Sequence, residues 1–437
     1  MKRILFSFLL FSTAFFSAFS QTSLRIMQYN LLYYGSYPSW CPITGNNPDF
    51  KDAYLKTLVD YIHPDVFCVN ELGAGNTNAS RILENVLNSD NPGKYERGLS
   101  TNNGFSDIVN MLYFNTEKLV LYSQEQVTKD SNNNALARII DLYTLYFKDA
   151  DLAQSNDTIF ITFIVAHLKA GSSSANQLSR ALETEALMEH LNGKDTPANY
   201  IFSGDFNVRS SNETSFVNLV SNTNPALRFY DPINQLGTWY NNSDFASIHT
   251  QSTRVVSNTN NGCFASGGTD DRFDFILVSQ AINNDLLKVK YVTDSHTIPG
   301  QDGNRFKQSV TDPPNISAPQ NVINAIYEMS DHYPVYLDLE VDAVLSNKEK
   351  VKRKAEITFI NPVTDFLELK INCFDCNLSS VEITNLGGKL VLKENLSGGN
   401  GIFFLKSDVM GFEKGMYLIK IINRDGSFFS RKMIKNH

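Results

Sequence analysis

The chain is poor in cysteine, and its few cysteines offer no obvious metal site. Five cysteines among 437 residues leave at least one thiol over when the others pair. Cys68 lies in the apolar run Val66–Val69, which predicts a buried thiol in a strand. Cys373 and Cys376 form a single CxxC pair without a second pair or a neighbouring histidine. A zinc site is therefore not expected there, and a local disulfide or two free thiols are the alternatives.

Positive charge is scarce over most of the chain. Residues 21–345 contain 21 Lys and Arg against 36 Asp and Glu, a net charge of −15. Residues 346–437 are basic instead, with 15 Lys and Arg against 10 Asp and Glu. Tight binding to polyanions without sequence preference rests on Lys and Arg contacts, so the composition of the larger region argues against such binding.

Long hydrophobic runs are absent after the N-terminus. Met1–Arg3 is basic, Ile4–Phe16 is almost wholly apolar, and Ala18 and Ser20 are small. This order is typical of a secretory signal peptide at residues 1–20. An uncleaved membrane anchor is the alternative, but the apolar run is short for one. No later stretch is long enough to span a bilayer, so we expect no integral membrane span.

Length and composition predict a globular protein of several domains. Hydrophobic residues make up 42% of the chain, which is enough for a sizeable core. The length suggests two or three domains. We expect a signal peptide at 1–20, a catalytic body at 21–345, a charged linker at 346–355 and a C-terminal domain at 356–437.

Apolar periodicity in the body predicts strands interspersed with helices. Helices are expected at 52–63, 80–88 and 177–191, and a long polar loop that could overlie a site is expected at 294–319. In the C-terminal domain, seven short strands between 357 and 434, separated by turns, predict a small all-β sandwich. The strands expected in the body are 24–30, 65–70, 109–114, 119–122, 139–147, 159–166, 198–202, 272–279 and 335–341.

The stretch Ser203–Asn207 places a carboxylate and a carboxamide two residues apart, directly after a predicted buried strand. On an extended backbone residues i and i+2 face the same way, so we expect Asp205 and Asn207 to reach into one site. Such groups suit a hard divalent cation and a phosphate oxygen. The pattern also occurs in ordinary turns, so its meaning depends on partners elsewhere in the chain.

Other polar residues also lie at or near the ends of predicted strands. Each has an ordinary structural explanation, since a lone histidine after a strand is usually a hydrogen-bonded core residue. Glu71 could cap the following turn, and Asp274 could form a sheet-face ion pair with Arg272. Because strand ends converge along one rim of a sheet, their joint occurrence predicts one pocket. The residues are Asn30, Glu71, His167, Asp205, Asn207, Asp274, Asp331 and His332.

Six short motifs carry these residues across about residues 24–341. They are Gln28-Tyr29-Asn30, Asn70-Glu71, Ala166-His167-Leu168, Gly204-Asp205-Phe206-Asn207, Arg272-Phe273-Asp274-Phe275-Ile276 and Ser330-Asp331-His332-Tyr333-Pro334. Together they resemble the motifs of the endonuclease/exonuclease/phosphatase superfamily. The resemblance implies an α/β (α+β) four-layer sandwich, in which two packed mixed β-sheets are flanked by helices and the site lies at one rim. It also implies metal-assisted hydrolysis of a phosphoester.

The resemblance assigns catalytic roles by position. It implies that His332 is the general base that activates water and that Asp274 orients its ring. An imidazole titrates near neutrality, and a carboxylate behind it fixes its tautomer, so the chemistry agrees. Asp205 and Asn207 are implied to position the nucleophile and the phosphate. His167 is implied to stabilise charge on the phosphate or the leaving oxygen.

The resemblance also implies a divalent cation, Mg²⁺ or else Mn²⁺ or Ca²⁺, which would neutralise phosphate charge in an acidic pocket. Glu71 is implied to bind this cation with Asn30 beside it, and Asp331 is implied to support the cation or His167. Lys169 lies two residues after His167 and is expected to contact substrate phosphate, although a solvated loop lysine is an equal alternative. Arg272 is also expected to contact substrate.

The C-terminal region resembles the sorting domain of the type IX secretion system. Asn361-Pro362-Val363, Gly415–Ile421 and Arg431–Lys435 carry this likeness, over about residues 356–437. It implies an interaction with the type IX secretion machinery, export through the periplasm and outer membrane, and a secreted or cell-surface location. The alternative is an ordinary β-sandwich that assists binding.

Together these observations predict a secreted, divalent-metal-dependent phosphoester hydrolase that acts as a monomer. The simplest form is a phosphodiesterase or endonuclease acting on extracellular nucleic acid. Leu32 stands where abasic-site endonucleases carry an aspartate, which argues against DNA repair. A phosphatase or a sphingomyelinase-like phospholipase is the alternative, which the acidic body keeps open. A catalytically inactive binding module is less favoured, because both histidines and all the expected carboxylates are present.

Overall fold

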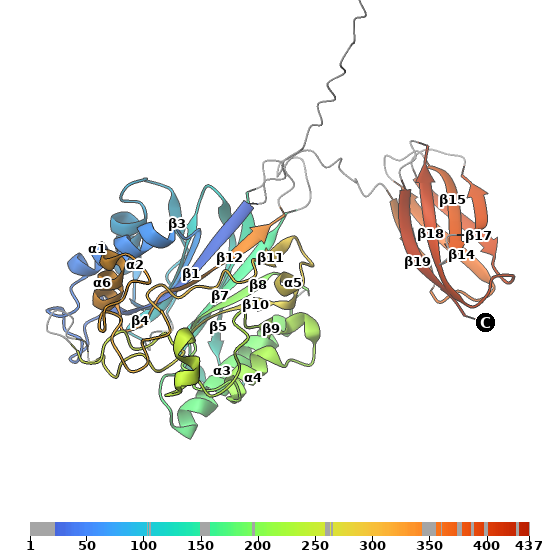
Figure 1. Cartoon of the computed structure of the whole chain (residues 1–437). Helices are drawn as coiled ribbons and strands as arrows, with labels where there is room; N and C mark the ends of the chain where they lie inside the picture. Colours follow the sequence, from blue (N-terminus) through green and yellow to red (C-terminus); the bar gives the residue numbers. More distant parts are fainter. Residues whose placement is uncertain are drawn as a thin grey trace, which may run out of the picture. The chain divides into compact units, whose positions relative to one another are not determined.

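The computed structural model describes residues 22–342 and 355–436, apart from 103, 105, 149–157, 195–196, 258–262, 264, 360, 374–377, 386–388, 397–400 and 425–427. The chain divides into two compact units, Met1–Ser346 and Asn347–His437 (Figure 1). The expected signal peptide, nearly all of the expected linker and Cys376 lie outside the described residues.

The first unit, the body, contains two six-stranded mixed sheets. The first sheet has the order β11-β12-β1-β2-β4-β3, with β1 and β2 parallel; the second has the order β5-β6-β7-β8-β10-β9, with β7 and β8 parallel. The remaining neighbours in both sheets are antiparallel. The strands are β1 (Thr22–Tyr34), β2 (Val66–Gly73), β3 (Tyr95–Arg97), β4 (Ile108–Asn115), β5 (Leu119–Lys129), β6 (Ala135–Phe147), β7 (Phe160–His167), β8 (Tyr200–Asp205), β9 (Phe229–Tyr230), β10 (Asp274–Ser279), β11 (Val289–Tyr291) and β12 (Val335–Val341).

Helices flank the two sheets, and the apolar core fills the space between and beneath them. Helices α1 (Pro48–Ile62), α2 (Asn76–Ile82) and α6 (Gln320–Met329) gather on the side of the first sheet, and α3 (Ser174–Asn192) and α4 (Thr214–Val220) on the side of the second (Figure 1). A short helix, α5 (Gln280–Asn283), follows β10. One continuous cluster of buried side chains joins both sheets. The expected four-layer sandwich is confirmed.

Local signals set the helix ends. The side chain of Asn47 caps the N-terminus of α1, where Pro48 takes the first helical position. The helix ends at His63, which has a left-handed φ of 55° and precedes Pro64. Ser173 caps α3 in the same way as Asn47 caps α1.

The predicted helices and strands of the body are all present. Most of their ends differ by a few residues, but β5 extends to Lys129, seven residues beyond the predicted end. Six helices and strands were not expected: α4, α5, α6, β3, β9 and β11. Three of them are strands of only two or three residues, too short for a period to show. Helix α6 does carry an amphipathic pattern, since Val322, Ile323, Ala325, Ile326 and Met329 are its buried residues.

The second unit is a small all-β sandwich, as expected. A three-stranded sheet, β13-β14-β17, faces a four-stranded sheet, β16-β15-β18-β19, and all pairs are antiparallel. Alternate residues such as Leu367, Leu369 and Ile371 fill the core. The strands are β13 (Ala355–Thr358), β14 (Phe366–Cys373), β15 (Leu378–Asn385), β16 (Leu390–Asn395), β17 (Gly401–Asp408), β18 (Gly415–Asn423) and β19 (Phe428–Lys435).

Two cysteine findings bear on the body. Cys68 is a fully buried free thiol in β2, as predicted. Cys41 and Cys263 form a disulfide across 222 residues, which the sequence did not indicate. Among the described residues, no helix is both long and apolar enough to cross a membrane.

Candidate active site

The polar residues at the predicted strand ends converge at one rim of the two sheets. Asn30 pairs in register with Asn70 across the parallel strands β1 and β2. His167 and Asp205 are the last residues of the parallel strands β7 and β8 and lie opposite one another, and Asp274, the first residue of β10, pairs with Asp205. Two parallel pairs that face each other thus deliver side chains from both sheets to one place.

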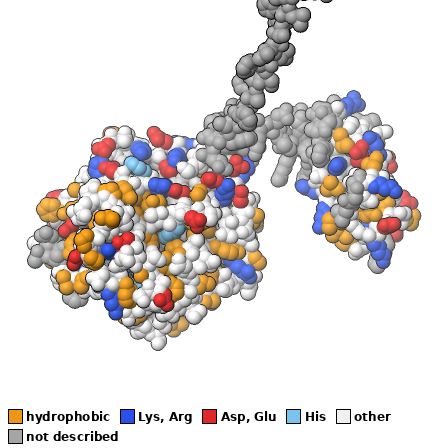
Figure 2. Space-filling view, viewed as in Figure 1, with side chains coloured by type: hydrophobic (Ala, Val, Ile, Leu, Met, Phe, Trp, Pro, Cys, Tyr) orange, Lys and Arg blue, Asp and Glu red, His pale blue; other side chains and the backbone are white. Residues whose placement is uncertain are grey.

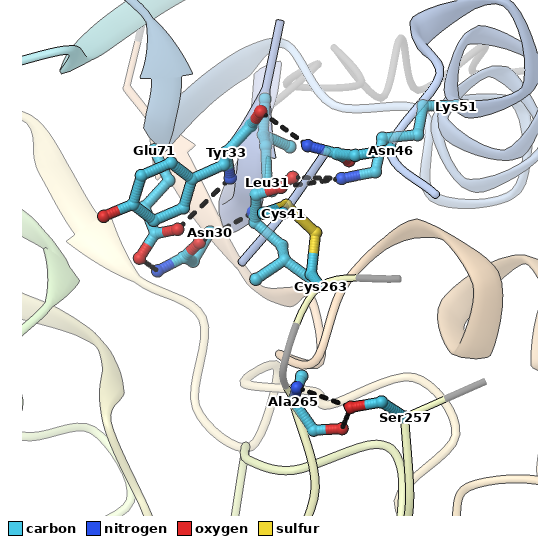
Figure 3. The surroundings of a disulfide bond; sticks show 11 residues. Asn30, Leu31, Tyr33, Cys41, Asn46, Lys51, Glu71, Ser257, Cys263 and Ala265 are labelled. Carbon is cyan, nitrogen blue, oxygen red and sulfur yellow. Dashed lines mark hydrogen bonds between the residues drawn. A yellow bond between two sulfur atoms is a disulfide. The ribbon is translucent and has the colours of Figure 1, made fainter. Parts of the chain in front are cut away.

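A bulge at the end of β1 holds Asn30 in position. The register between β1 and β2 shifts after Asn30, and Leu32 and Tyr33 have positive φ angles of 47° and 55°. The buried Nζ of Lys51 donates to the carbonyl oxygens of Leu31 and Leu32, each at 2.8 Å (Figure 3). The side chain of one helix residue therefore satisfies two carbonyls that the sheet cannot reach.

Glu71 also lies in a bulge, rather than at the simple strand end that was expected. The β2–β4 register shifts between Val69 and Leu72, and Glu71 has a φ of 55°. This turn aims the carboxylate at β1, where Oε2 accepts the backbone N–H of Tyr33 at 3.2 Å (Figure 3). Its Oε1 accepts the side-chain amide of Asn30 at 3.1 Å.

Asn30 connects the two carboxylates at the centre of the site. Its Nδ2 donates to Oε1 of Glu71 at 3.1 Å and to Oδ2 of Asp205 at 3.0 Å. Its Oδ1 accepts the backbone N–H of Leu32 at 3.0 Å. In this orientation the amide nitrogen, not the oxygen, faces the carboxylates, so the amide would have to turn over to ligate a cation through oxygen.

The two histidines flank Asp205. Nε2 of His167 lies 3.4 Å from Oδ2 of Asp205 and 3.8 Å from Oε1 of Glu71. Nε2 of His332 lies 3.6 Å from the same Oδ2 of Asp205. Nδ1 of His332 lies 2.7 Å from Oδ2 of Asp274, so that carboxylate holds the ring with the proton on Nδ1.

A threonine that the sequence reasoning did not single out fixes Asp274. Oγ1 of Thr250 accepts the backbone N–H groups of Phe273 and Asp274, at 3.0 and 3.1 Å. Thr250 and Asp274 are buried. The start of β10 is therefore anchored where its carboxylate meets His332.

Gln251 is a second residue that sequence reasoning missed. Its Nε2 donates to Oδ2 of Asp331 at 2.9 Å and lies 3.0 Å from Nε2 of His332. The amide can donate to that ring nitrogen only when the nitrogen carries no proton. A lone glutamine in a long loop carries no motif, so its position could come only from the fold.

Asp205 reaches the site because β7 and β8 approach very closely. A Cβ atom on Gly204 would lie 1.8 Å from the carbonyl oxygen of Ala166, and Gly204 has a φ of 154°. Only glycine fits there. The expectation of an extended backbone as far as Asn207 is wrong, because Asn207 has a left-handed φ of 52°. The chain turns after Phe206, whose N–H donates to the carbonyl of Phe273.

This turn changes what Asn207 does. Its backbone N–H donates to Oδ1 of Asp205 at 3.1 Å, and its Nδ2 donates to the carbonyl oxygen of Leu168 at 3.3 Å. Asparagine tolerates the left-handed region better than most residues, which suits it to this position. The carboxamide thus lies beside the chain that follows His167.

A buried polar network supports Asp205 from behind. Oδ1 of Asn70 accepts the backbone N–H of Asp205 at 2.9 Å, and Nδ2 of Asn70 donates to Oδ1 of Asn110 at 2.8 Å. Nδ2 of Asn110 donates in turn to Oδ2 of Asp141 at 3.2 Å, and Thr101 donates to the other oxygen of Asp141 at 2.5 Å. The network runs from the second sheet through the first and back to the candidate site.

Burial makes the carboxylates of the site costly to ionise. Burial raises the pKa of Asp205 to about 7, with the charges of Asp274 and Glu71 adding to the effect and His332 opposing it. Burial and the charge of Asp331 raise the pKa of Glu71. Carboxylates so placed are stabilised by a cation between them.

The two histidines differ in their electrostatic surroundings. Burial, together with the positive charge of Arg138, lowers the pKa of His167 well below its usual value. Burial also acts to lower the pKa of His332. The negative charges of Asp274, Asp331 and Asp205 outweigh burial and raise that pKa well above its usual value. A cation that neutralised those carboxylates would remove much of this effect.

Arg138 is a positive charge that the sequence reasoning overlooked. Its Nε and Nη2 donate to the carbonyl oxygens of His167 and Leu168, at 3.1 and 3.0 Å. It is half-buried, and the described residues give it no carboxylate partner. Lys169 is also half-exposed, and its Nζ has only the carbonyl of Ala170 at 3.5 Å among the described residues.

Arg272 is not brought into the cluster. Its two terminal nitrogens donate to the carboxylate of Asp231 at 2.7 and 2.8 Å, and the guanidinium is 1% exposed. Its ring neighbours are Trp239 and Phe275. The side chain is thus a buried ion pair with Asp231, not the sheet-face pair with Asp274 that was considered.

The residues present suit a divalent cation. Among the described residues, one atom each of Glu71, His167 and Asp205 lie within 4.8 Å of one another, the spacing of ligands around one ion. Oδ1 of Asp331 and Oδ1 of Asp274 are buried without a hydrogen-bond partner among the described residues. Buried carboxylate oxygens without partners are costly, and a cation or its water ligands would satisfy them.

The second unit agrees with a known family. Its two antiparallel sheets are those expected of the C-terminal region. Residues 359–436 match the secretion system C-terminal sorting domain. The expected sorting domain is therefore confirmed. It implies an interaction with the type IX secretion machinery and indicates export, with the protein secreted or attached to the cell surface.

No curated protein matches the chain by sequence. Solved structures similar to it include an endonuclease/exonuclease/phosphatase from Bacteroides vulgatus (15% identity, 74% of this chain and 100% of that chain, TM-score 0.45). Others are the human Nocturnin catalytic domain with bound sulfate (13%, 73% and 94%, 0.44) and D. rerio TDP2 with a single-strand DNA product (13%, 73% and 99%, 0.44). One of these names the superfamily that the six motifs resemble. At such identities and TM-scores the likeness carries no argument about activity, which must come from the side chains.

Proposed function

We propose that the body is a divalent-metal-dependent phosphoester hydrolase, most simply a phosphodiesterase or endonuclease acting on extracellular nucleic acid. The observation that carries the proposal is the pairing of His332 with Asp274 at 2.7 Å beside a buried group of carboxylates. A histidine held in one tautomer next to cation ligands is the arrangement that activates water against a phosphoester.

His332 acts as the general base. Asp274 holds the proton on Nδ1, which leaves Nε2 to take a proton from water once the amide of Gln251 gives up its contact with that nitrogen. Nε2 lies 3.6 Å from Oδ2 of Asp205, so a water beside both atoms would be within hydrogen-bond reach of the two groups. When the water loses its proton, Asp274 stabilises the imidazolium that forms.

Glu71 and Asp205 hold the cation, with Asn30 beside them and Asp331 in support. Bound there, a divalent cation neutralises the charge that builds on the phosphate oxygens. Asn30 fixes the carboxylates of Glu71 and Asp205 relative to each other, because its amide nitrogen donates a hydrogen bond to both. Gln251 holds Asp331 in the same way from the other side.

His167 and its neighbours bind the phosphate. The lowered pKa of His167 keeps the ring neutral, so it acts as a hydrogen-bond donor, not as a charge. Asn207 and Arg138 lie beside the chain that follows this histidine and supply an amide and a guanidinium. Lys169 lies on the same segment, is half-exposed, and provides a second positively charged side chain besides Arg138.

The test is turnover by the full chain on plasmid DNA, RNA, sphingomyelin and inositol polyphosphates, each with Mg²⁺ or with chelator. We expect chelator-sensitive cleavage of nucleic acid. His332→Ala should lower turnover by about 10²–10⁴-fold while the variant stays folded, although loss of the partner of the buried Asp274 should lower its unfolding midpoint. His190→Ala is the matched control, because His190 lies on α3 and pairs with Glu125.

Three outcomes would contradict the proposal in different ways. Release of phosphate or phosphocholine without cleavage of nucleic acid would move the assignment to a phosphatase or phospholipase. Equal turnover by His332→Ala and the unaltered protein would show that His332 is not the general base. Absence of turnover on every substrate with every metal would favour a binding module.

A further inference from the structure

An exposed aromatic pair lies directly beside the candidate cation ligands and has no part in the mechanism above. The rings of Tyr33 and Trp40 have centroids 4.6 Å apart and planes at 78°, so they form a right-angled corner. The N–H of Tyr33 donates to the carboxylate of Glu71 (Figure 3). Trp40 is 42% exposed, and Tyr33 is partly exposed.

The phenol of Tyr33 lies in the electrostatic field of charged residues of the site. Burial raises its pKa, the charge of Glu71 raises it further, and Arg138 opposes this shift. The ring therefore lies within the electrostatic reach of both a proposed cation ligand and a proposed phosphate-binding guanidinium. A group seated on this corner would be next to the phosphate that the site holds.

The corner is rigid. Nζ of Lys51 holds the bulge beneath it, and Nδ2 of Asn46 donates to the carbonyl oxygen of Tyr33 at 2.8 Å (Figure 3). Cys41, next to Trp40, is bound to Cys263, and these two cysteines pack with Leu32 in a small buried cluster. Rigid aromatic side chains bind with little loss of conformational entropy.

We propose that Tyr33 and Trp40 form a stacking subsite for an unpaired nucleobase next to the scissile phosphate, which makes single-stranded nucleic acid the preferred substrate. This inference rests on the proposed phosphodiesterase function. A nucleotide carries a flat ring one sugar away from each phosphate, and every base can stack on an aromatic side chain. A base inside a duplex has both faces covered by its neighbours, so it cannot stack here.

The charge of the body agrees with a single strand rather than a duplex. Duplex binding without sequence preference relies on many Lys and Arg contacts along the phosphates. Residues 21–345 carry a net charge of −15. On the face of the body seen in Figure 2, Lys and Arg side chains lie scattered rather than gathered in a track. Affinity must therefore come largely from another source, and stacking supplies it.

The experiment compares three substrates of one sequence with the full chain: a single-stranded oligonucleotide, its duplex, and a single strand whose bases are removed around one cleavable phosphate. We expect KM to be lowest for the intact single strand. Trp40→Leu and Tyr33→Leu should raise that KM by about 5- to 100-fold and abolish the difference from the abasic strand. Trp40→Phe should largely restore the value, because it keeps an aromatic face.

Tyr122→Leu is the matched control. Tyr122 is 67% exposed and forms a similar edge-on pair with Phe160, with centroids 5.1 Å apart, but it lies on β5 and contacts no candidate site residue among those described. This variant should leave KM and kcat unchanged for all three substrates.

Binding can also be followed without turnover. Trp40 and Trp239 are the only tryptophans of the chain, and Trp239 is fully buried. In the His332→Ala background, the intact single strand should therefore quench the fluorescence of Trp40, and the abasic strand should not. Quenching should be lost in Trp40→Phe.

The results separate this inference from the proposed function. Cleavage of all three substrates with equal KM, unchanged in Trp40→Leu, would overturn the stacking subsite and leave the phosphodiesterase intact. A Trp40→Leu defect in the turnover of sphingomyelin, with no defect on the single strand, would also overturn it. No cleavage of any nucleic acid by the unaltered protein would overturn both.

Discussion

Replacing Asp141 with asparagine should make the body more stable, and increasingly so as pH rises. Asp141 is fully buried on β6, and burial raises its pKa to about 7, while Thr101 and Asn110 donate hydrogen bonds that oppose the shift. Its ordinary value is 3.8. The folded protein therefore holds a proton on this group, between about pH 4 and pH 7, that the unfolded chain releases. The free energy of unfolding falls with rising pH across this window and is level above it.

The size of the effect follows from the two pKa values. One unit is worth about 1.4 kcal/mol, so the full cost of the buried carboxylate above pH 7 is about 4 kcal/mol, of which about 2.5 kcal/mol arises between pH 5 and pH 8. Asparagine matches the shape of a protonated aspartate and can accept from Asn110 while donating to Thr101. Its own contribution does not change with pH.

The assay is urea unfolding of the full chain at pH 5, 6, 7 and 8, followed by tryptophan fluorescence. Both tryptophans lie in the body, so the signal reports the body and not the sorting domain. The difference in unfolding free energy between Asp141→Asn and the unaltered protein should grow by about 2.5 kcal/mol from pH 5 to pH 8. Asp60→Asn, at an exposed site on α1, is the control and should give a difference independent of pH. A pH-independent difference for Asp141→Asn would refute the reasoning.

Three further changes test the packing that positions the site. Gly204→Ala should lower the unfolding free energy of the body by more than about 4 kcal/mol, because its Cβ would overlap a backbone oxygen. The control is Gly93→Ala, whose Cβ meets no atom within 4 Å and which should cost about 1 kcal/mol. Equal losses in the two variants would contradict the close approach at Gly204. Lys51→Met should cost about 2 kcal/mol or more, because two backbone carbonyls lose their donor, and unchanged urea unfolding would show that they find another. Cys41→Ser with Cys263→Ser should cost about 2–5 kcal/mol, measured the same way without reductant, and no loss would mean that the loops are held without the bond.

The parts of the fold that follow from local pattern were predictable. Apolar runs and helical spacing located the principal strands and helices, because burial imposes a period on each of them. Gly204 and Asp205 indicated the end of a strand, and short motifs indicated His167 and His332 as site residues. The left-handed turn at Asn207 was missed, since the same four residues are compatible with an extended chain.

What the sequence could not provide are contacts between distant segments. Gln251 meets Asp331 and His332 only because an irregular loop passes beside the segment that leads into β12. Arg138 lies near the start of β6 and becomes part of the site only when β6 pairs with β7. Such residues carry no local signal, because their role is created by the strand order.

The disulfide between Cys41 and Cys263 constrains when the exported chain can be oxidised. Its partners are 222 residues apart, so nearly the whole body must have emerged before they can meet. Cys68 is a far nearer partner for Cys41 along the chain. Burial in β2 raises the pKa of the Cys68 thiol to about 12, which suppresses the reactive thiolate. Assembly of the first sheet before oxidation would therefore protect Cys68 and leave Cys41 to pair with Cys263.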